Sequence, residues 1–185
     1  YNTDGFDLGT GTNCNQSNID FVSWTFRKAE KFFDIVTYTG NGSGNRAIAH
    51  NLGSSPGMVI IKQRSGGENW VVWHRSLASN KMLTFTAGAT TGGTPTFDSS
   101  LMSSTTFGVN TDGSSNANGS TYVAYLFAHN DSGDGEFGPD ADQDIIKCGG
   151  VTATGGAFTV NLGFEPQWVM LKKASGSGDW IILDS

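Results

Sequence analysis

Residues 51–62 read NLGSSPGMVIIK, and residues 161–172, which lie 110 positions later, read NLGFEPQWVMLK. The match extends without a gap over residues 34–73 and 144–183, with 13 identities in 40 positions. Unrelated sequences would share only about two or three residues over such a length. Each copy has Gly and Pro in a turn followed by an apolar, β-branched run, which is typical of a turn leading into a strand. The recurrence therefore predicts a repeated β-rich unit.

A second, weaker match lies upstream, where residues 6–26 align with residues 107–127 at an offset of 101. The residues that recur in this match are Phe6, Thr10, Asn15, Val22 and Phe26. Because the two offsets differ by nine residues, the extra residues must lie between Phe127 and Asp144. Repeated units tolerate length changes in such connections, where little backbone is buried.

Together the two matches divide the chain into five parts. Residues 34–128 form one complete unit of about 95 residues, which is joined on both sides to partial units. The other parts are the C-terminal part of a preceding unit (1–27), a short linker (28–33), an acidic Gly/Asp linker (129–143) and the N-terminal part of a following unit (144–185). We therefore expect the chain to be a window across a tandem array, or a processed product.

The complete unit has the strand pattern of an antiparallel sandwich. Short apolar runs are bounded by Gly, Asn, Ser and Pro, and they predict seven strands: Asp34–Thr39, Arg46–His50, Gly57–Gln63, Asn69–His74, Lys81–Thr86, Phe107–Val109 and Thr121–His129. The expected fold is all-β, with each unit the size of a small jelly roll or immunoglobulin-like β-sandwich.

Composition supports the β class and argues against several partners. Gly, Ser, Thr and Asn make up 78 of 185 residues, which disfavours helix interiors and therefore an all-α fold. The net charge is −6, and the 11 Lys and Arg residues are scattered, so we expect no nucleic acid partner. Apolar runs have only strand length, so no membrane partner is expected either. With only Cys14 and Cys148, two independent thiols are favoured over a single bridge.

Several segments resemble tail-fibre and other virion proteins of tailed bacteriophages, especially marine ones. The segments are Phe21–Ala29, Phe32–Asp34, His50–Gly53, Pro56–Met58, Tyr122–His129, Asp134–Asp140 and Asp144–Gly149. The resemblance covers nearly the whole chain, although residues 76–104 carry no matching motif. It implies tandem concanavalin-like β-sandwich domains in a virion appendage, and hence a virion or extracellular location. The resemblance assigns no binding residue to a position in this chain.

The sequence lacks the residue patterns that are typical of enzyme active sites, so we expect that the protein is not an enzyme. The four glutamates are Glu30, Glu68, Glu136 and Glu165, and none has a carboxylate partner at glycosidase spacing inside a predicted strand. No nucleophile elbow is present, and the three histidines are far apart in sequence. A glycan hydrolase acting through Glu136 or Asp140 remains a minor alternative.

Two small sets of residues are candidate sites. Asp140, Asp142 and Asp144 offer oxygen ligands that suit Ca²⁺, although they lack a full calcium-loop signature and also fit a solvated linker. No other cofactor is expected. Trp73, His74 and Arg75 fit an exposed sugar-stacking and hydrogen-bonding platform. Trp70 and Trp180 are equivalent in the repeat and are therefore expected in a core or inter-sheet role, and the alignment of Trp73 with Leu183 favours packing for Trp73 too.

These observations favour a non-enzymatic structural protein of a phage tail fibre or related appendage, and they leave room for contact with a host-surface polysaccharide. Expected partners are other virion proteins and copies of the same chain, in a trimer or a filament. One alternative is a carbohydrate-binding, lectin-like module. Another is a self-assembling extracellular filament, in which residues 1–27 and 144–185 of different subunits complete one another. Such a composite unit would lack middle strands, so further flanking sequence is the simpler explanation.

Overall fold

The computed structural model describes residues 3–79, 81–86, 88, 95–130, 137, 139–140 and 142–184. Within these ranges the chain is nearly all β. The elements, in chain order, are β1 (Phe33–Thr39), β2 (Arg46–Ala49), β3 (Met58–Gln63), β4 (Val71–His74), β5 (Leu83–Thr84), the 3-10 turn η1 (Ser99–Leu101), β6 (Thr106–Val109), α1 (Gly113–Asn116), β7 (Thr121–Phe127), β8 (Trp168–Lys172) and β9 (Trp180–Asp184). All seven strands predicted between residues 34 and 129 are confirmed, within a few residues at their ends.

Five of the strands form one antiparallel sheet in the order β1-β7-β3-β4-β5. Strand β7 pairs on one side with β1, placing Phe127 opposite Phe33, and on the other with β3, placing Phe127 opposite Met58. Strands β2 and β6 pair separately, and β8 and β9 form a third, two-stranded sheet. Because β1 and β7 are far apart in sequence, their pairing closes the unit from residue 33 to residue 127.

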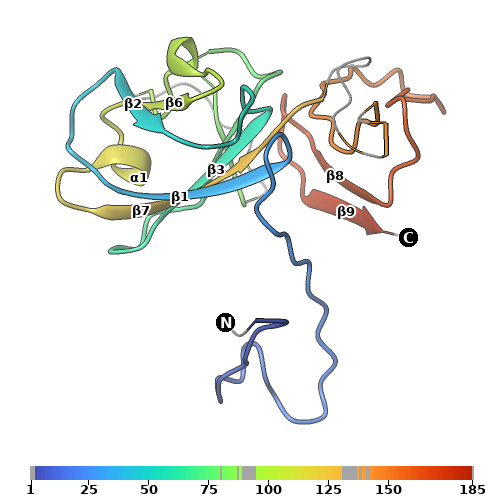
Figure 1. The fold of residues 1–185 in the computed structure, drawn as a ribbon, viewed down its shortest axis with the longest axis horizontal. Coiled ribbons are helices and arrows are strands. Elements are labelled where there is room, and N and C mark those ends of the chain that lie inside the picture. The colour runs from blue at the N-terminus through green and yellow to red at the C-terminus, as the bar shows by residue number, and fades with distance from the viewer. Residues whose placement is uncertain are drawn as a thin grey trace.

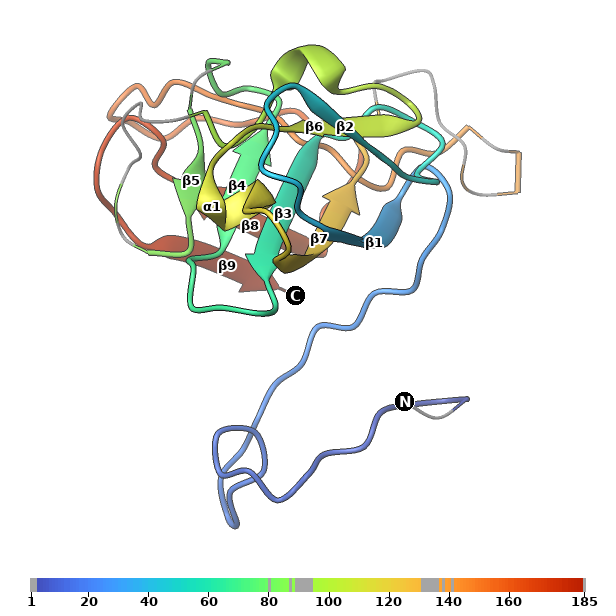
Figure 2. The same ribbon diagram turned by 90° about the vertical axis from the view of Figure 1, so that its left-hand side faces the viewer.

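The β2–β6 pair lies across one face of the five-stranded sheet, as Figure 2 shows. Its buried side chains Ile48, Phe107 and Val109 join one apolar cluster with Val59 and Val71 of the large sheet. Alternate residues of a strand point to opposite faces, so this cluster takes every second residue of β3 and β4. Two antiparallel sheets therefore enclose the main core.

The opposite face of the large sheet carries a second apolar cluster, which includes Met58, Ile60 and Val72. Met170 of β8 and Trp180 of β9 pack against this cluster, so the β8–β9 hairpin covers the outer face of the sheet. The same arrangement is visible in Figure 2, where β8 and β9 lie behind the sheet on the side away from β2 and β6.

The two hairpins have the same register. In the first, Met58 pairs with His74 and Ile61 with Val71; in the second, Trp168 pairs with Asp184 and Leu171 with Ile181. All of these pairs are related by the offset of 110. The lysine near the end of each run also repeats its contact, since Lys62 Nζ donates to the carbonyl of Glu68 and Lys172 Nζ to that of Gly178.

Residues 3–27 contain no strand among those described, and they run away from the body of the molecule (Figure 1). Their large apolar side chains are exposed, and Val22 is 81% exposed. The contact with the body comes at Phe26, whose ring lies 5.6 Å from that of Phe33 and 6.3 Å from that of Trp168. The segment thus reaches the body at the junction of the large sheet and β8.

Neither Trp70 nor Trp180 is fully buried, and Trp180 has the inter-sheet role that is one alternative of the prediction, because it packs against the outer cluster of the large sheet. Trp70 is 38% exposed and stacks on Tyr125, with 6.0 Å between ring centroids. Trp180 packs against Phe85, the residue after β5, at 5.0 Å between ring centroids and edge to face. Both side chains lie on the outer face of the large sheet. How far each is buried depends on what covers that face, and their equivalent positions in the repeat do not determine it.

Candidate functional site

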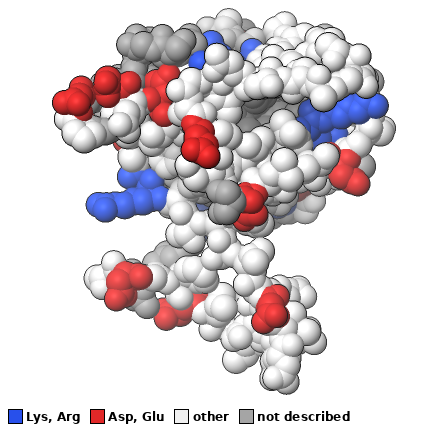
Figure 3. All heavy atoms as spheres, turned by 90° about the vertical axis from the view of Figure 1, so that its right-hand side faces the viewer, with Lys and Arg blue, Asp and Glu red and all other residues white. Residues whose placement is uncertain are grey.

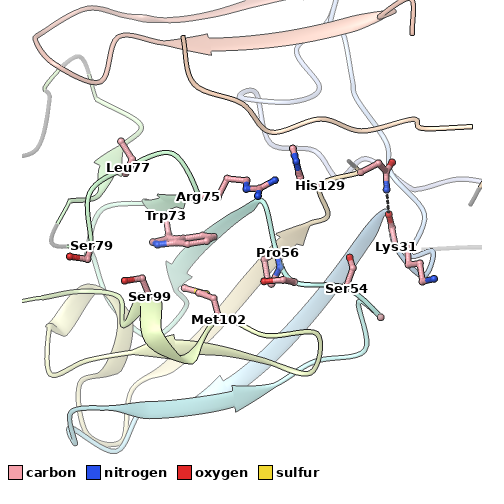
Figure 4. Close-up of a pocket in the computed structure, with 13 residues that line it drawn as sticks. Lys31, Ser54, Pro56, Trp73, Arg75, Leu77, Ser79, Ser99, Met102 and His129 are labelled. Atoms are coloured by element: carbon pink, nitrogen blue, oxygen red, sulfur yellow. Dashed lines mark hydrogen bonds between the residues drawn. The ribbon is translucent and has the colours of Figure 1, made fainter. Parts of the chain in front are cut away.

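A hollow of about 940 Å³ opens where β4 ends, beside the loop that precedes β3. It is bordered by the loop 53–56, by β4 and the residues after it, by the η1 region, and by the residues that follow β7. Figure 4 shows Trp73 lying across the middle of this site, with Met102 and Ser99 on one side and Arg75 on the other. Segments far apart in sequence therefore meet at one end of the sheet.

Trp73 and Arg75, two of the three residues predicted to bind a sugar, both line the hollow. Trp73 belongs to β4, and Arg75 follows the end of that strand by one residue, in the turn after it. Trp73 is only 6% exposed and belongs to the main core cluster, so its ring is not the predicted exposed stacking platform. Arg75 is exposed, and its backbone nitrogen donates to the carbonyl of Gly57 over 2.9 Å.

His74 does not belong to the hollow, because alternation along the strand turns it to the other face. Its Nδ1 accepts a hydrogen bond from the backbone of Ser76 over 3.1 Å. Burial lowers the pKa of His74, and the positive charge of Arg75 lowers it further. The imidazole is therefore neutral at pH 7, and its role in the structure is to shape the turn after β4.

The border of the hollow nearest β1 is fixed by Asn130. Its side-chain nitrogen donates to the carbonyl of Lys31 over 3.3 Å, the contact drawn as a dashed line in Figure 4. Its side-chain oxygen accepts from the backbone nitrogens of Ile145 and Ile146, both over 3.1 Å. Asn130 is 5% exposed, so these bonds are largely shielded from water. One buried amide thus ties three chain segments together beside the hollow.

The hollow is lined by cations and small polar groups. Lys31 and Arg75 both line it, and the described residues that line it include no Asp or Glu, although the carboxyl group of Glu30 lies against Gly53 at its border. The remaining polar lining is Ser54, Ser55, Ser79, Ser99, His129 and Asn130. The hydroxyl of Ser54 is buried and has no hydrogen-bond partner within the described part of the chain. Such a set of donors suits a carboxylate or sulfate group better than a cation.

This local basic character contrasts with the acidic chain as a whole. The net charge is −6, and on the face shown in Figure 3 acidic and basic side chains are scattered rather than gathered by sign. The cationic border of the hollow is therefore a local feature of the segments that meet there.

The predicted calcium site is not assembled by the described residues. Asp140 and Asp142 are exposed, and Asp144 is half-buried with one side-chain oxygen that lacks a hydrogen-bond partner within the described chain. No three acidic, histidine or cysteine side chains are grouped as metal ligands in the described ranges. Asp131, Asp134 and Glu136, the other acids of the linker, lie outside the described residues.

Sequence reasoning missed Lys31, Ser54 and Asn130. Nothing in their local sequence distinguishes them from ordinary loop residues. Lys31 and Asn130 reach the hollow because β1 pairs with β7, which brings the residues before β1 and after β7 to the same end of the sheet, whereas Ser54 belongs to the loop that precedes β3. A correct prediction of that pairing would have been the only available signal.

The model of one protein family, described as a domain of unknown function (DUF7483), matches residues 1–185, and the chain belongs to this family. Comparison with curated proteins gives no match, and comparison with solved structures gives none either. Among the described residues, no helix has the length and apolar character needed to cross a membrane.

Proposed function

We propose that the chain is a non-enzymatic structural protein of a phage tail fibre or related virion appendage, built from tandem concanavalin-like β-sandwich units. The observation that carries this proposal is the second hairpin. The β8–β9 hairpin has the register of β3–β4, and it packs on the outer face of the sheet that contains β3 and β4. Units that repeat in sequence and pack directly on one another form the rod-like arrays typical of repeat proteins.

The resemblance of Phe21–Ala29 and Tyr122–His129 to virion proteins provides the biological context of this proposal. An antibody raised against the chain tests the location on phage particles that carry the gene. Labelling of a fibre or other appendage in electron micrographs is expected. Labelling that is absent from virions and confined to infected cells would contradict the assignment.

A second candidate function, glycan recognition, is favoured by the hollow at Trp73 and Arg75. We propose that it binds an acidic saccharide, such as a surface polysaccharide that contains uronic acid or sulfate. Arg75 would pair with the anionic group, and the serine hydroxyls and Asn130 would bond to sugar hydroxyls. Since Trp73 is largely buried, it would form the floor of the site rather than a stacking face.

Binding to an array of neutral and acidic glycans tests this candidate. We expect saturable binding of acidic glycans that weakens at least about tenfold in Arg75→Ala, the size expected for one charge-assisted pair. Arg64→Ala is the matched control, because Arg64 is exposed and does not line the hollow. Equal loss in both variants would indicate non-specific charge attraction, and hydrolysis of a bound glycan would overturn the non-enzymatic assignment.

A further inference from the structure

One edge of β8 is unpaired among the described residues, although the equivalent strand in the complete unit is paired on both sides. Strand β3 lies between β4 and β7, whereas β8 pairs with β9 alone. The face of the hairpin that corresponds to the main core is also uncovered. Leu171 is 48% exposed and Ile181 is 53% exposed, while their equivalents Ile61 and Val71 are fully buried. The hairpin therefore lacks a strand partner where β3 has β7.

Residues 21–26 have the sequence of the strand that would fill this edge. They align with residues 122–127 of β7 at the offset of 101, with Val22 matching Val123 and Phe26 matching Phe127. Alternation along this segment places Phe26, Trp24 and Val22 on one side, as it does for their equivalents in β7. The segment has strand-forming residues but forms no strand in the described structure.

The region that precedes this segment already has the local geometry of its equivalent. The backbone nitrogens of Cys14 and Asn15 both donate to the carbonyl of Gly11, as those of Ser115 and Asn116 donate to that of Asp112. Ile19 donates to the carbonyl of Gln16, as Ser120 does to that of Ala117. Asn18 has φ of 62°, and Gly119 at the aligned position has φ of 78°. Residues 11–19 thus repeat the turns that lead into β7.

The register is marked by one contact that already exists. In the complete unit Phe127 of β7 pairs with Met58 of β3. The aligned residues are Phe26 and Trp168, and their rings lie 6.3 Å apart at 81° in the same chain. Phe26 therefore lies beside the position that a strand added to β8 would give it, and only a short tether separates it from the start of β1 at Phe33.

We propose that residues 21–26 add to the open edge of β8 of the same chain, in the register that β7 has with β3. In this register Phe26 faces Trp168, Trp24 faces Met170 and Ser23 faces Leu171. Residues 5–8, aligned with β6, would then lie near residues 156–159, aligned with β2. Within residues 1–185, six of the seven strands of the unit would have a counterpart, and the exception is the two-residue strand β5. The result is a second sandwich of circularly permuted strand order.

The same chain, rather than a second copy, is the favoured source of the strand. Phe26 is already held against Phe33, Phe127 and Trp168, so a strand from another copy would have to displace it. The short tether also gives the segment a high effective concentration at β8. The proposal does not depend on the virion assignment or on the glycan site, because it is argued from strand pairing, turn geometry and ring contacts and not from the resemblance or the hollow.

An engineered disulfide tests this pairing in the full chain. Directly opposed residues of antiparallel strands have Cα atoms about 4.5–5.5 Å apart, within the range of a disulfide. In a Cys14→Ser background, Ser23→Cys with Leu171→Cys should form a disulfide within the monomer under mild oxidation, detected by peptide mapping and intact mass. The matched control is Ser23→Cys with Met170→Cys, in which a shift of one residue places the thiols on opposite faces and prevents the bond.

Hydrogen exchange of the unmodified chain provides a measurement that needs no variant. The backbone amides of residues 21–26 that face β8 should exchange at least about tenfold more slowly than in an unstructured peptide, because they would be hydrogen-bonded to that strand. Exchange at the unstructured rate, or equal disulfide yield in the control pair, would overturn the pairing. A disulfide found only between two chains would overturn the assignment of the strand to the same chain.

Discussion

Trp180 donates a hydrogen bond from its indole nitrogen to the backbone carbonyl of Thr84 over 2.8 Å, although 96 residues separate the two. The same ring packs edge to face against Phe85. These contacts join β9 to the end of β5, and so connect the second hairpin to the five-stranded sheet. Because the indole N–H has a hydrogen-bond partner and the ring packs against an apolar side chain, the orientation of Trp180 at this contact is fixed.

The side chain of Asn116 should be among the most important polar groups for stability. It is fully buried, its nitrogen donates to the carbonyl of Ser43 over 2.7 Å, and its oxygen accepts from Arg46 over 2.8 Å and from the backbone of Asn41 over 3.1 Å. Asn116→Ala should lower the free energy of unfolding by about 3 kcal/mol, because it leaves several of these groups unpaired. Urea unfolding measures this change.

The matched control for that variant is Asn118→Ala, two positions away. Asn118 is exposed, so its replacement should change the unfolding free energy by less than about 0.5 kcal/mol. Similar losses in both variants would show that the Asn116 network contributes little.

Stability should fall in acid, in part through Asp34. Burial alone would raise the pKa of this carboxyl, but hydrogen bonds from Lys28 and from the backbone of Asn51 and Ile35 outweigh burial and lower the pKa. The pKa of Asp34 is lower in the folded chain than in the unfolded chain, where it is about 3.9. The ionised carboxylate therefore stabilises the fold above that pH, and this stabilisation is lost as the pH falls through the pKa of the folded chain. Unfolding free energies from pH 6 down to about pH 2 measure the effect.

In Asp34→Asn, the decrease in stability below about pH 4 should be smaller than in the parent chain, because the titrating group is absent. Asp179→Asn removes an exposed carboxylate and should leave the decrease unchanged. A parent and an Asp34→Asn chain with identical acid profiles would contradict the role assigned to Asp34.

The thiol of Cys148 should be inert in the native protein. Burial raises the pKa of this thiol to about 12, an effect that the nearby charge of Arg75 only partly opposes, and both cysteines are unpaired. In Cys14→Ser, where only Cys148 remains, Ellman's reagent at about pH 8 should react slowly with the native chain and rapidly after denaturation. Rapid reaction of the native variant would show that residues 144–148 do not stay packed against the sheet.

Local elements are predictable from the sequence because their signals are local. Alternating apolar residues and Gly/Pro turns locate β3 and β4, and the repeat predicts a second hairpin that has the same register. Trp73, which lies in β4, and Arg75, in the turn after it, both line one hollow. The same alternation turns the His74 side chain to the opposite face of the sheet, away from the hollow. The spacing alone would therefore have predicted that His74 does not line the hollow.

Features that depend on packing between distant segments are not predictable in this way. Lys31 and Asn130 border the hollow only because β1 pairs with β7. The repeat predicts the same core or inter-sheet role for Trp70 and Trp180, yet only Trp180 packs against the outer cluster of the large sheet, and neither is fully buried. Their surroundings depend on what covers the outer face of each sheet, and a repeat in sequence carries no information about that covering.

The packing of the second hairpin on the complete unit is the central claim, and the indole N–H of Trp180 reports on it most directly. Its hydrogen exchange rate can be followed by NMR in the unmodified chain and compared with that of N-acetyltryptophanamide in the same buffer. The bond to Thr84 predicts exchange at least about tenfold slower than in the reference compound. An indole N–H that exchanges as fast as the reference would show that β9 is not held against the sheet, and would contradict the account of stacked units.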